Sequence, residues 1–489
     1  MRVPLPVLLC ATHALSAAAM SPATIGLVKD RLKDAAQKRQ VPDDPCDLGT
    51  RVQALLELQA PSVSVFTAKV IPGSPAANGA NPIPNARSDG ELDDVLGLAY
   101  QILADKDKDA LPLMEDGSSA DPASNGVGIL VANWSGAQGA DFAGAAQGQL
   151  KWLLENVPRS ERGAISHRNS EVQLWADYLY MVPPFLAYYG AVTSNKTLIA
   201  ESFNQIKLYR EVLLDKAGYW QHIRLGSWED QGIWTTGNGW IAMGMLRVAA
   251  TIRAAGYEPE FTSELKDIRD WTAEIFNAMW PLLTKDNLFY NYVNEPDTFL
   301  DSAGTTLMAA SVYRAALLFG DTKYIPSAEK VYIALGGTQL NSTTNARRRH
   351  AARDTHHRVV LSPHAHMHHS RASQYLSADG WLKPVVDPHS FHQPGDISAE
   401  GQAFVLMLYA ARNDWLTKEN ASKSGLGANV VGVGTSNGTG VGLSGAVNMA
   451  ENVDQTKQKV SGAGRMAQIG LSALVVGVAG TVAVVSCVL

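Results

Sequence analysis

Several helices that the apolar spacing predicts in this chain are apolar on nearly every face. The densest stretch, residues 175–190 (WADYLYMVPPFLAYYG), contains a single charged side chain, Asp177. A helix that is hydrophobic all round has to be buried, so an inner layer of helices must be covered by an outer one. The chain is long enough for such a structure, and no short repeat of the solenoid kind is visible in it. The sequence therefore predicts an all-α domain, a toroid of paired helices, rather than a simple bundle.

The predicted helices follow one another with short connections and few convincing strands. Besides the helix at Trp175, they cover residues 21–39, 49–58, 92–104, 121–133, 145–156, 198–214, 239–255, 261–279, 305–319, 327–335 and 399–412. Asp121 and Asn238 are expected to cap two of them, and Gly256 to end the helix that Asn238 begins. Residues 62–66 alternate and predict a short strand, whereas residues 71–85 predict a loop.

Both ends of the chain have the composition of processing signals. Residues 1–19 place an arginine before an apolar run and a small-residue zone, as a secretory signal peptide does. Residues 461–489 predict a GPI-attachment signal, because small residues precede an apolar stretch; a retained tail anchor is the alternative. Between the two we expect a catalytic domain at residues 20–415 and a flexible linker, rich in Gly and Ser, at residues 416–460.

These ends predict an extracellular protein that a C-terminal anchor attaches to the membrane, and we expect it to be a monomer. With Cys10 in the signal peptide and Cys487 in the tail, Cys46 stands alone in the mature chain, which excludes an intramolecular disulfide. Asn-X-Ser/Thr sequons fit a secreted glycoprotein. They occur at Asn133, Asn195, Asn341, Asn420 and Asn437.

Charge excludes one class of partner. The net charge is −6 and most basic residues are scattered, so we expect no nucleic-acid partner. Residues 343–371 differ, because they are basic and rich in histidine. A metal site is one interpretation, but the segment has no regular ligand spacing, no cysteine and one acid, Asp354. We interpret it as a surface insertion or a translated intron, and we predict no metal and no cofactor.

Asp177 is the first candidate for catalysis. It lies two residues after Trp175 in the apolar run, where loss of hydration would raise the carboxyl pKa towards that of a general acid. An N-cap or a surface acid is the alternative. Tryptophan rings stack on sugars, and Asp, His and Asn side chains hydrogen-bond their hydroxyl groups, so the residues around Asp177 suit a saccharide site. The structural role that a lone His or Trp more often has is the alternative for the histidines and tryptophans among these residues. The candidates around Asp177 are Asp121, His167, His222, Trp234, Asn238 and Trp240.

The motifs that carry these residues resemble the unsaturated rhamnogalacturonyl hydrolases of glycoside hydrolase family 105, which are related to the unsaturated glucuronyl hydrolases of family 88. The matching elements are residues 165–167, 175–181 (WADYLYM), 184–185, 219–222 and 234–240 (WTTGNGW). The segments 380–387 and 398–404 are similar to the fungal branch of that family. The resemblance extends from about residue 49 to residue 412, apart from the His-rich segment, and it implies an (α/α)6 barrel.

What the resemblance implies is a hydration reaction on pectin oligosaccharides that a polysaccharide lyase has generated. Such enzymes hydrate the C4=C5 double bond of the unsaturated uronic acid at the non-reducing end, and the hemiketal then collapses and releases the neighbouring sugar. Asp177 matches the general acid/base, and Asp121 matches the second aspartate, which holds the sugar and poises the first acid. The predicted substrate-binding set is His167, His222, Trp234, Thr236, Asn238 and Trp240.

Two positions depart from the family's pattern. Thr236 stands where many bacterial members carry an arginine, a potential bidentate partner for an anionic sugar, and Cys46 stands where an aromatic side chain is common. Two other functions therefore stay open. One is an ordinary inverting glycosidase on the same barrel, with Asp121 and Asp177 flanking the scissile bond. The other is an inactive, surface-anchored saccharide-binding or cell-wall protein.

Overall fold

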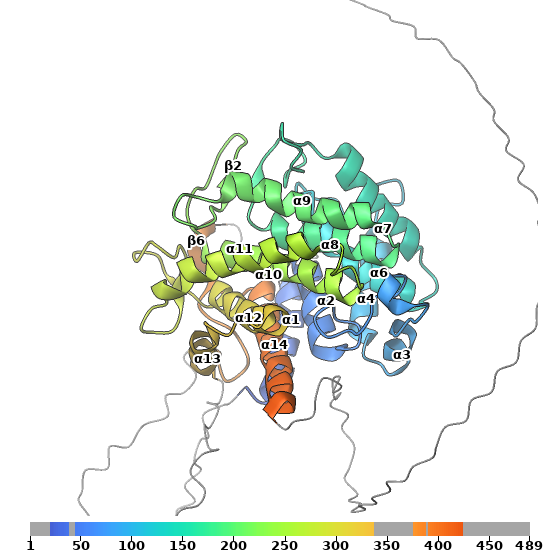
Figure 1. Ribbon diagram of the computed structural model, residues 1–489. Coiled ribbons are helices and arrows are strands. Elements are labelled where there is room, and N and C mark those ends of the chain that lie inside the picture. The colour runs from blue at the N-terminus through green and yellow to red at the C-terminus, as the bar shows by residue number, and fades with distance from the viewer. Residues whose placement is uncertain (1–19, 39–44, 337–374, 388–389, 424–489) are drawn as a thin grey trace, which may run out of the picture. The chain divides into compact units, whose positions relative to one another are not determined.

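The computed structural model describes residues 20–38, 45–336, 375–387 and 390–423. All of them belong to one compact unit, shown in colour in Figure 1. Several predicted segments lie outside the described residues: the signal peptide (1–19), the His-rich segment (343–371), the C-terminal signal (461–489) and the linker beyond Lys423.

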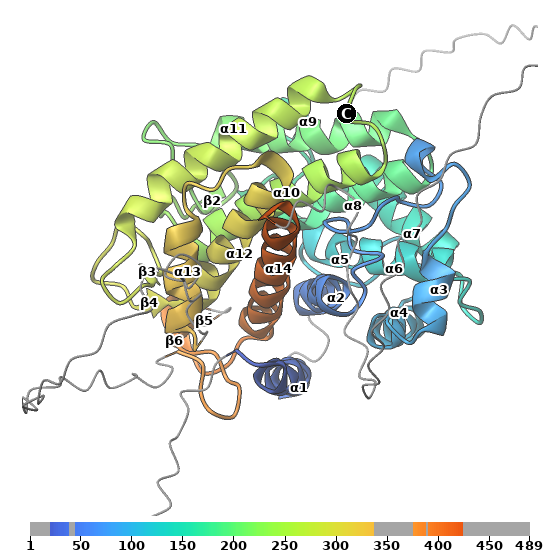
Figure 2. The same ribbon diagram turned by 60° about the horizontal axis from the view of Figure 1, so that its bottom comes forward.

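A closed ring of helices forms the centre of this unit (Figures 1 and 2). Its members, in order around the ring, are α2 (Pro45–Gln59), α5 (Ala120–Ser124) with α6 (Gly126–Trp134), α8 (Tyr178–Val192), α10 (Thr235–Ala254), α12 (Ser302–Phe319) and α14 (Ala399–Lys423). Each member contacts the next, and α14 contacts α2. Because both neighbours of every ring helix are helices, these segments need apolar residues on several faces, as the sequence indicated.

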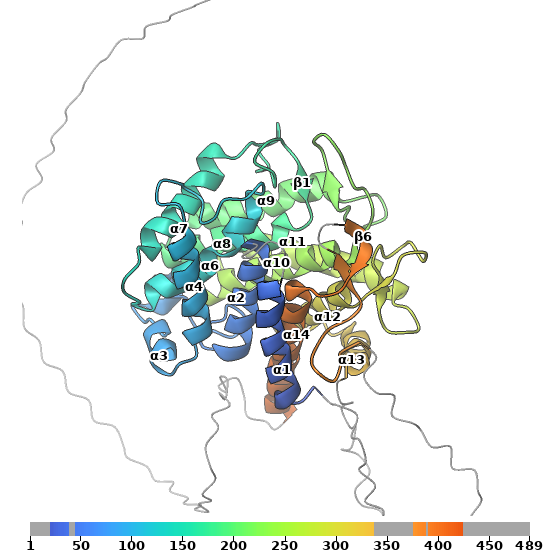
Figure 3. The ribbon, with the colours of Figure 1, turned by 180° about the vertical axis from the view of Figure 1, so that it is seen from behind.

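A second layer of helices covers the ring from outside. It consists of α1 (Pro22–Lys38), α4 (Asp93–Asp105), α7 (Phe142–Lys151), α9 (Lys196–Leu213), α11 (Thr262–Met279) and α13 (Ile325–Ala334). Each outer helix contacts an inner one, and Figure 3 shows α1 beside α2 and α14. These outer helices have one buried stripe only, as in α11, where Leu265, Ile268 and Ile275 face inward. The predicted (α/α)6 toroid is confirmed.

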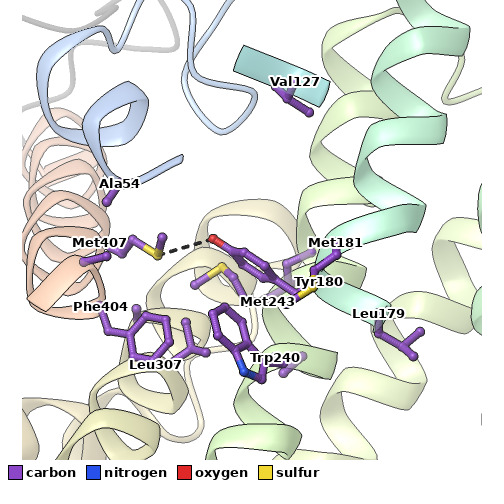
Figure 4. Close-up of a cluster of buried hydrophobic side chains, with 14 of the residues drawn as sticks. Ala54, Val127, Leu179, Tyr180, Met181, Trp240, Met243, Leu307, Phe404 and Met407 are labelled. Carbon is purple, nitrogen blue, oxygen red and sulfur yellow. Dashed lines mark hydrogen bonds between the residues drawn. The ribbon is translucent and has the colours of Figure 1, made fainter. Parts of the chain in front are cut away.

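Close backbone contact and aromatic packing fill the ring. A Cβ atom on Gly244 of α10 would lie 2.0 Å from the carbonyl oxygen of Leu179 in α8, so only glycine allows these two helices to approach so closely. Figure 4 shows Trp240 and Tyr180 next to each other, with Phe404 of α14 beside the indole. Such dense contacts make the centre of the barrel a packed core rather than a channel.

Two ion pairs that share the buried Arg314 side chain join three ring helices. Arg314 of α12 is fully buried; it donates to Glu57 of α2 at 2.7 Å and to Asp414 of α14 at 2.6 Å. Removing either partner of such a pair would leave an uncompensated charge in the interior. This contact fixes the closing of the ring, because α2 and α14 are its first and last members.

Short two-stranded ribbons connect the helices at one end of the barrel. They are β1 (Leu174–Trp175) with β2 (Ile223–Arg224), β3 (Phe289–Tyr290) with β4 (Leu300–Asp301), and β5 (Val385–Asp387) with β6 (Ser390–Gly395). The smaller helix α3 (Ile83–Ser88) and the 3-10 turn Pro75–Ala77 lie between α2 and α4, and a second 3-10 turn, Trp280–Leu282, lies between α11 and β3. A π-helical turn, Trp152–Asn156, follows α7.

The structure corrects several details of the sequence prediction. Residues 62–66 form turns, not a strand, because Ser64 N donates back to the carbonyl of Ala60. Residues 121–133 are two helices: the Asn125 side chain donates to the carbonyl of Pro45, and the helix is interrupted there. Asp121 lies inside α5 rather than at its cap.

Three further boundaries differ from the prediction. Asn238 lies in the first turn of α10, and Trp234 occupies the N-cap position, because the Asn238 carboxamide binds the backbone of Trp220 instead. The helix expected at Trp175 begins at Tyr178. The last helix, α14, extends to Lys423, beyond the predicted domain boundary at residue 415. Of the helices in the described residues, none is both long and apolar enough to span a membrane.

Candidate active site

Inner helices begin close to one another at one end of the barrel. Thr236 in the first turn of α10 donates to Asp301, the N-cap of α12, at 2.7 Å. Cys46 in the first turn of α2 donates to Glu400 in the first turn of α14 at 3.0 Å. Asp177 is the N-cap residue of α8. Functional side chains from distant parts of the sequence therefore meet at this end.

The Asp177 carboxyl group is not used for capping. It makes no side-chain bond to the start of α8, and within the described residues its buried Oδ1 atom has no hydrogen-bond partner. The side chain is 15% exposed, and Oδ1 lies 3.9 Å from Nε2 of His222. Burial raises the pKa of Asp177 to about 6; His222 opposes this effect and the charge of Glu400 adds to it. The group can therefore hold a proton near neutral pH and give it up, as a general acid must.

His222 is held by a hydrogen-bonded chain. Its Nδ1 atom lies 2.9 Å from Oδ2 of Asp230, and the Tyr292 hydroxyl group donates to the same oxygen at 2.5 Å. Burial opposes the ionisation of Asp230, but the bonds from His222, Tyr292 and Gly232 outweigh it and lower the Asp230 pKa to about 2. The ionised Asp230 orients the imidazole ring, so that its Nε2 atom is directed towards Asp177.

His167 packs on Trp175, which also contacts His222. The two rings are stacked at 4.7 Å with an interplanar angle of 10°, and His222 meets the same indole edge-on at 5.8 Å. Burial, the charge of Arg168 and His222 lower the pKa of His167 to about 3, so this imidazole is neutral at physiological pH. Its Nε2 atom lies 3.3 Å from the Ser118 hydroxyl group. Its buried Nδ1 atom has no hydrogen-bond partner within the described residues.

Aromatic side chains surround the two histidines. Phe391 of β6 lies edge-on to His222 at 4.9 Å and near Trp234 at 5.7 Å. The indole of Trp234 packs on His222 at 4.4 Å and donates to Asn291. Trp228 is 47% exposed and meets Trp175 edge-on at 5.6 Å. These rings make the surroundings of His222 apolar, and aromatic rings are surfaces on which sugars can stack.

Four of the predicted residues lie together in the cluster just described: Asp177, His222, His167 and Trp234. Asp121 is half-buried at the start of α5, where its backbone N–H donates to the Ser118 hydroxyl group that also faces His167. The charge of Glu400 acts on Asp177, and the predicted role of Asp121 beside that acid stays a prediction.

Three predicted substrate-binding residues are occupied elsewhere. Trp240 is 1% exposed and packs in the barrel core, against Tyr180 and Phe404, so we correct its assignment to the sugar site. The Asn238 carboxamide binds the backbone of Trp220 and Trp234. Thr236 is buried, and its hydroxyl group donates to Asp301. The Asn238 and Thr236 side chains hold the start of α10 in place, and their contact with substrate stays a prediction.

Sequence reasoning missed four residues of the cluster: Asp230, Tyr292, Phe391 and Glu400. Asp230 follows His222 by eight positions, and only the tight turn that pairs Ile223 with Asp230 brings the two side chains together. Phe391 and Glu400 come from the end of the chain, which the ring brings back to α8 and α10. The motif around Glu400 was visible in the sequence, but nothing local indicated a charge near Asp177.

Among the described residues, no group of three or more His, Cys, Asp or Glu side chains is placed to hold a metal ion. The histidines of residues 343–371 lie outside these residues.

Comparison with known proteins agrees with this geometry. Residues 100–349, more than half of the chain, match Glycosyl Hydrolase Family 88. The chain belongs to this family. A curated relative, the unsaturated rhamnogalacturonyl hydrolase YesR of Bacillus subtilis, is 23% identical over 188 residues, which are 36% of this chain and 52% of YesR. The chain thus matches about half the length of that relative.

Solved structures share the fold of this family 88 protein. A possible family 105 member from Salmonella enterica is 14% identical, with a TM-score of 0.56, and the match covers 80% of this chain and 93% of that one. The unsaturated glucuronyl hydrolase of Bacillus sp. GL1 is 13% identical, with a TM-score of 0.50, over 79% of this chain and 94% of that one. At such identities the likeness establishes the barrel alone. The similarity to the fungal branch stays a prediction.

Proposed function

We propose that this family 88 protein hydrates the C4=C5 double bond of an unsaturated uronic acid at the non-reducing end of lyase-generated rhamnogalacturonan oligosaccharides. One observation carries the proposal. A buried carboxyl group, Asp177, has a pKa of about 6 and an oxygen atom with no partner in the described residues, and it lies at an aromatic-lined end of the barrel. The curated relative that the chain matches carries the name of such a hydrolase.

The proposed reaction needs only water and one acid. Protonated Asp177 transfers its proton to C4, and positive charge develops at C5, which the ring oxygen stabilises. A water molecule then adds to C5 while the Asp177 carboxylate takes up its proton, so the group returns to its starting state. The product is a hemiketal that opens and releases the neighbouring sugar.

The surrounding residues have positioning roles in this proposal. Ionised Asp230 fixes the orientation of His222, whose Nε2 atom faces Asp177 at 3.9 Å and can also hydrogen-bond the water or the sugar. Neutral His167 offers its unpartnered Nδ1 atom to a sugar hydroxyl group. The indole of Trp234 and the ring of Phe391 keep bulk water away from the acid.

The two departures from the family's pattern are compatible with activity. Thr236 and Cys46 both bind carboxyl groups at helix starts, those of Asp301 and Glu400, and so they stabilise the site end of the barrel. An arginine for the uronate is not among the residues that contact Asp177 or His222 in the described structure. We propose that the protein acts outside the cell, since its N-terminal residues have the composition of a secretory signal.

The test is the ultraviolet absorbance of the unsaturated uronide. The full-length protein is incubated with lyase-digested rhamnogalacturonan, beside an Asp177→Asn variant and an Asp215→Asn control. Asp215 is half-buried in the loop after α9, where its Oδ1 atom accepts hydrogen bonds from the backbone of Ala217 and Tyr219, a role that an asparagine oxygen can also fill. We expect the absorbance to fall with wild type and with Asp215→Asn, and to stay constant with Asp177→Asn. Constant absorbance with wild type would refute the proposal and would favour the inactive saccharide-binding protein. Release of sugar from a saturated oligosaccharide would favour the inverting glycosidase.

A further inference from the structure

Among the tryptophans of the described residues, only Trp228 is exposed, and the reaction proposed above gives it no role. It lies in a loop, residues 225–229, that follows β2 and leads to Asp230, the residue that holds His222. A single exposed aromatic side chain needs no explanation in itself. Its surroundings decide whether it has a function.

The exposed indole borders the candidate active site. It meets Trp175 edge-on with an interplanar angle of 77°, and Trp175 contacts His222, whose Nε2 atom faces Asp177. An edge-on contact occupies at most one face of an indole, and Trp228 has no other ring contact within the described residues. At least one face of its ring is therefore open. Because the Asp177 side chain is also partly exposed, a ligand can reach both the acid and the indole from solvent.

One buried side chain, Gln173, fixes the positions of Trp175 and Trp228. Its carboxamide oxygen accepts the indole N–H of Trp175 at 2.8 Å, and its carboxamide nitrogen donates to the backbone carbonyl of Trp228 at 2.7 Å. A Cβ atom on Gly226 would lie 3.1 Å from the Gln173 side chain, so glycine leaves room for this bridge. The bridge holds the loop against β1, which ends two residues before Asp177.

Further contacts order the loop before any ligand binds. The Glu171 carboxylate accepts the backbone N–H of Ser227 at 2.6 Å and the hydroxyl group of the same residue at 2.8 Å. Leu225 has a φ angle of 68°, a left-handed conformation that is strained for so large a side chain. Its backbone N–H donates to Glu229 at 2.8 Å, and its side chain packs on the core. Such strain persists where surrounding contacts impose it, and it is frequent at ligand sites.

Stacking is the interaction that this surface offers to a sugar. The indole N–H of Trp228 makes no hydrogen bond within the described residues, so it can donate to a hydroxyl group while the ring face takes the apolar face of a pyranose. The charged side chains beside it are engaged locally. Arg224 is paired with Glu229 at 3.2 Å, and Glu171 binds Ser227. A ring that is already held in place loses little conformational entropy on binding.

We propose that Trp228 is the stacking platform for the sugar unit next to the unsaturated uronic acid, which is the unit that the reaction releases. The inference rests on the proposed function, because it takes the unsaturated unit to bind at Asp177. With that unit at the acid, the rest of the oligosaccharide extends towards solvent, and the exposed indole beside Trp175 is the aromatic surface that it meets.

The experiment compares a substrate that has a second sugar ring with one that lacks it. The specificity constant kcat/KM of the full-length protein is measured for an unsaturated disaccharide and for the methyl glycoside of the same unsaturated uronic acid. The variants are Trp228→Ala and Trp228→Tyr, with Tyr100→Ala, which removes an exposed ring of the outer helix α4, as a control. In Trp228→Ala we expect the ratio of the two constants, disaccharide over methyl glycoside, to fall roughly tenfold, which corresponds to about 1.4 kcal/mol. Trp228→Tyr should recover most of this ratio, because it restores a flat ring, and Tyr100→Ala should keep the wild-type ratio.

Other results would overturn this role of Trp228. An unchanged ratio in Trp228→Ala would do so even if both constants fell, because a loss that does not depend on the second ring is structural. A second readout does not depend on turnover: calorimetric titration of the disaccharide into Asp177→Asn and into Asp177→Asn/Trp228→Ala. Binding that is roughly tenfold weaker in the double variant is the expected result, and equal binding, or no binding to either variant, would refute the stacking contact. If wild type hydrates neither substrate, the proposed function fails, and this titration still decides whether Trp228 binds a sugar.

Discussion

Asp177 should destabilise the folded protein at neutral pH, and this cost can be measured. Its pKa is about 6 in the folded protein, compared with an ordinary value of 3.8. A carboxyl group whose pKa is raised by folding opposes folding once it is ionised, and the effect grows as the pH rises from about 4 to about 6. The difference in pKa corresponds to roughly 3 kcal/mol at pH 7.5, and to less than about 1 kcal/mol at pH 4. Asp177→Asn, which is neutral at every pH, should therefore stabilise the protein at pH 7.5 and change its stability little at pH 4.

Asp230→Asn provides a matched control with the opposite sign. The pKa of Asp230 is lowered to about 2, so its ionised form stabilises the folded protein above pH 4, and this contribution is lost as the pH falls towards 2. We expect this variant to lose roughly 2 to 3 kcal/mol at pH 7.5, because it lacks the ionised carboxylate that the hydrogen bonds from His222, Tyr292 and Gly232 stabilise. Urea unfolding followed by tryptophan fluorescence at the two pH values measures both effects. The reasoning would be refuted if Asp177→Asn had the stability of wild type at pH 7.5, or if its effect did not change with pH.

Further predictions concern the pH profile, the core and the ion pair. In the proposed reaction kcat should fall as the pH rises above an apparent pKa of about 6, because Asp177 loses its proton. Glu400→Gln should move this fall in kcat to lower pH, because it removes a like charge near Asp177. An unchanged pH profile would contradict the electrostatic coupling between Glu400 and Asp177. Trp240→Phe should lower the free energy of unfolding by about 1 to 2 kcal/mol and leave KM unchanged, whereas a raised KM would return Trp240 to the sugar site. Arg314→Met should lower the free energy of unfolding by about 3 to 5 kcal/mol, measured with urea, because Glu57 stays buried without its ion-pair partner. Adding Glu57→Gln should restore part of this free energy. No recovery in the double variant would show that the unpaired charge of Glu57 does not cause the loss of stability.

The fold could be predicted from the sequence because the barrel requires a visible pattern. Ring helices such as α8 must be apolar on several faces, and the segment that contains Tyr178 shows this directly. Cap positions were harder, since Asn238 is a common N-cap residue and only the position of Trp220 in space decides that it binds elsewhere.

A residue of the candidate active site could be predicted only where its neighbours in the sequence are also the side chains that change its chemistry. Asp177 was recognisable from its apolar neighbours, which cause the burial that raises its pKa. Asp230 and Glu400 were not, because the turn after His222 brings Asp230 to that imidazole and the closing of the ring brings the charge of Glu400 near Asp177. Trp234 and Trp240 belong to one short motif, but Trp234 precedes α10 with an extended backbone and packs on His222, whereas Trp240 lies inside the helix and packs in the core.

The contact between α2 and α14 has a consequence for how the chain folds. These helices are the first and last members of the ring, and Arg314 joins them through Glu57 and Asp414. During synthesis the ring cannot close until α14 has left the ribosome, and until then the apolar faces of α2 and α12 stay exposed. Contacts between segments so far apart in the chain slow folding and favour intermediates that aggregate. We therefore expect the nascent protein to depend on chaperones until its last helix has been made, and a chain that ends before α14 to be insoluble.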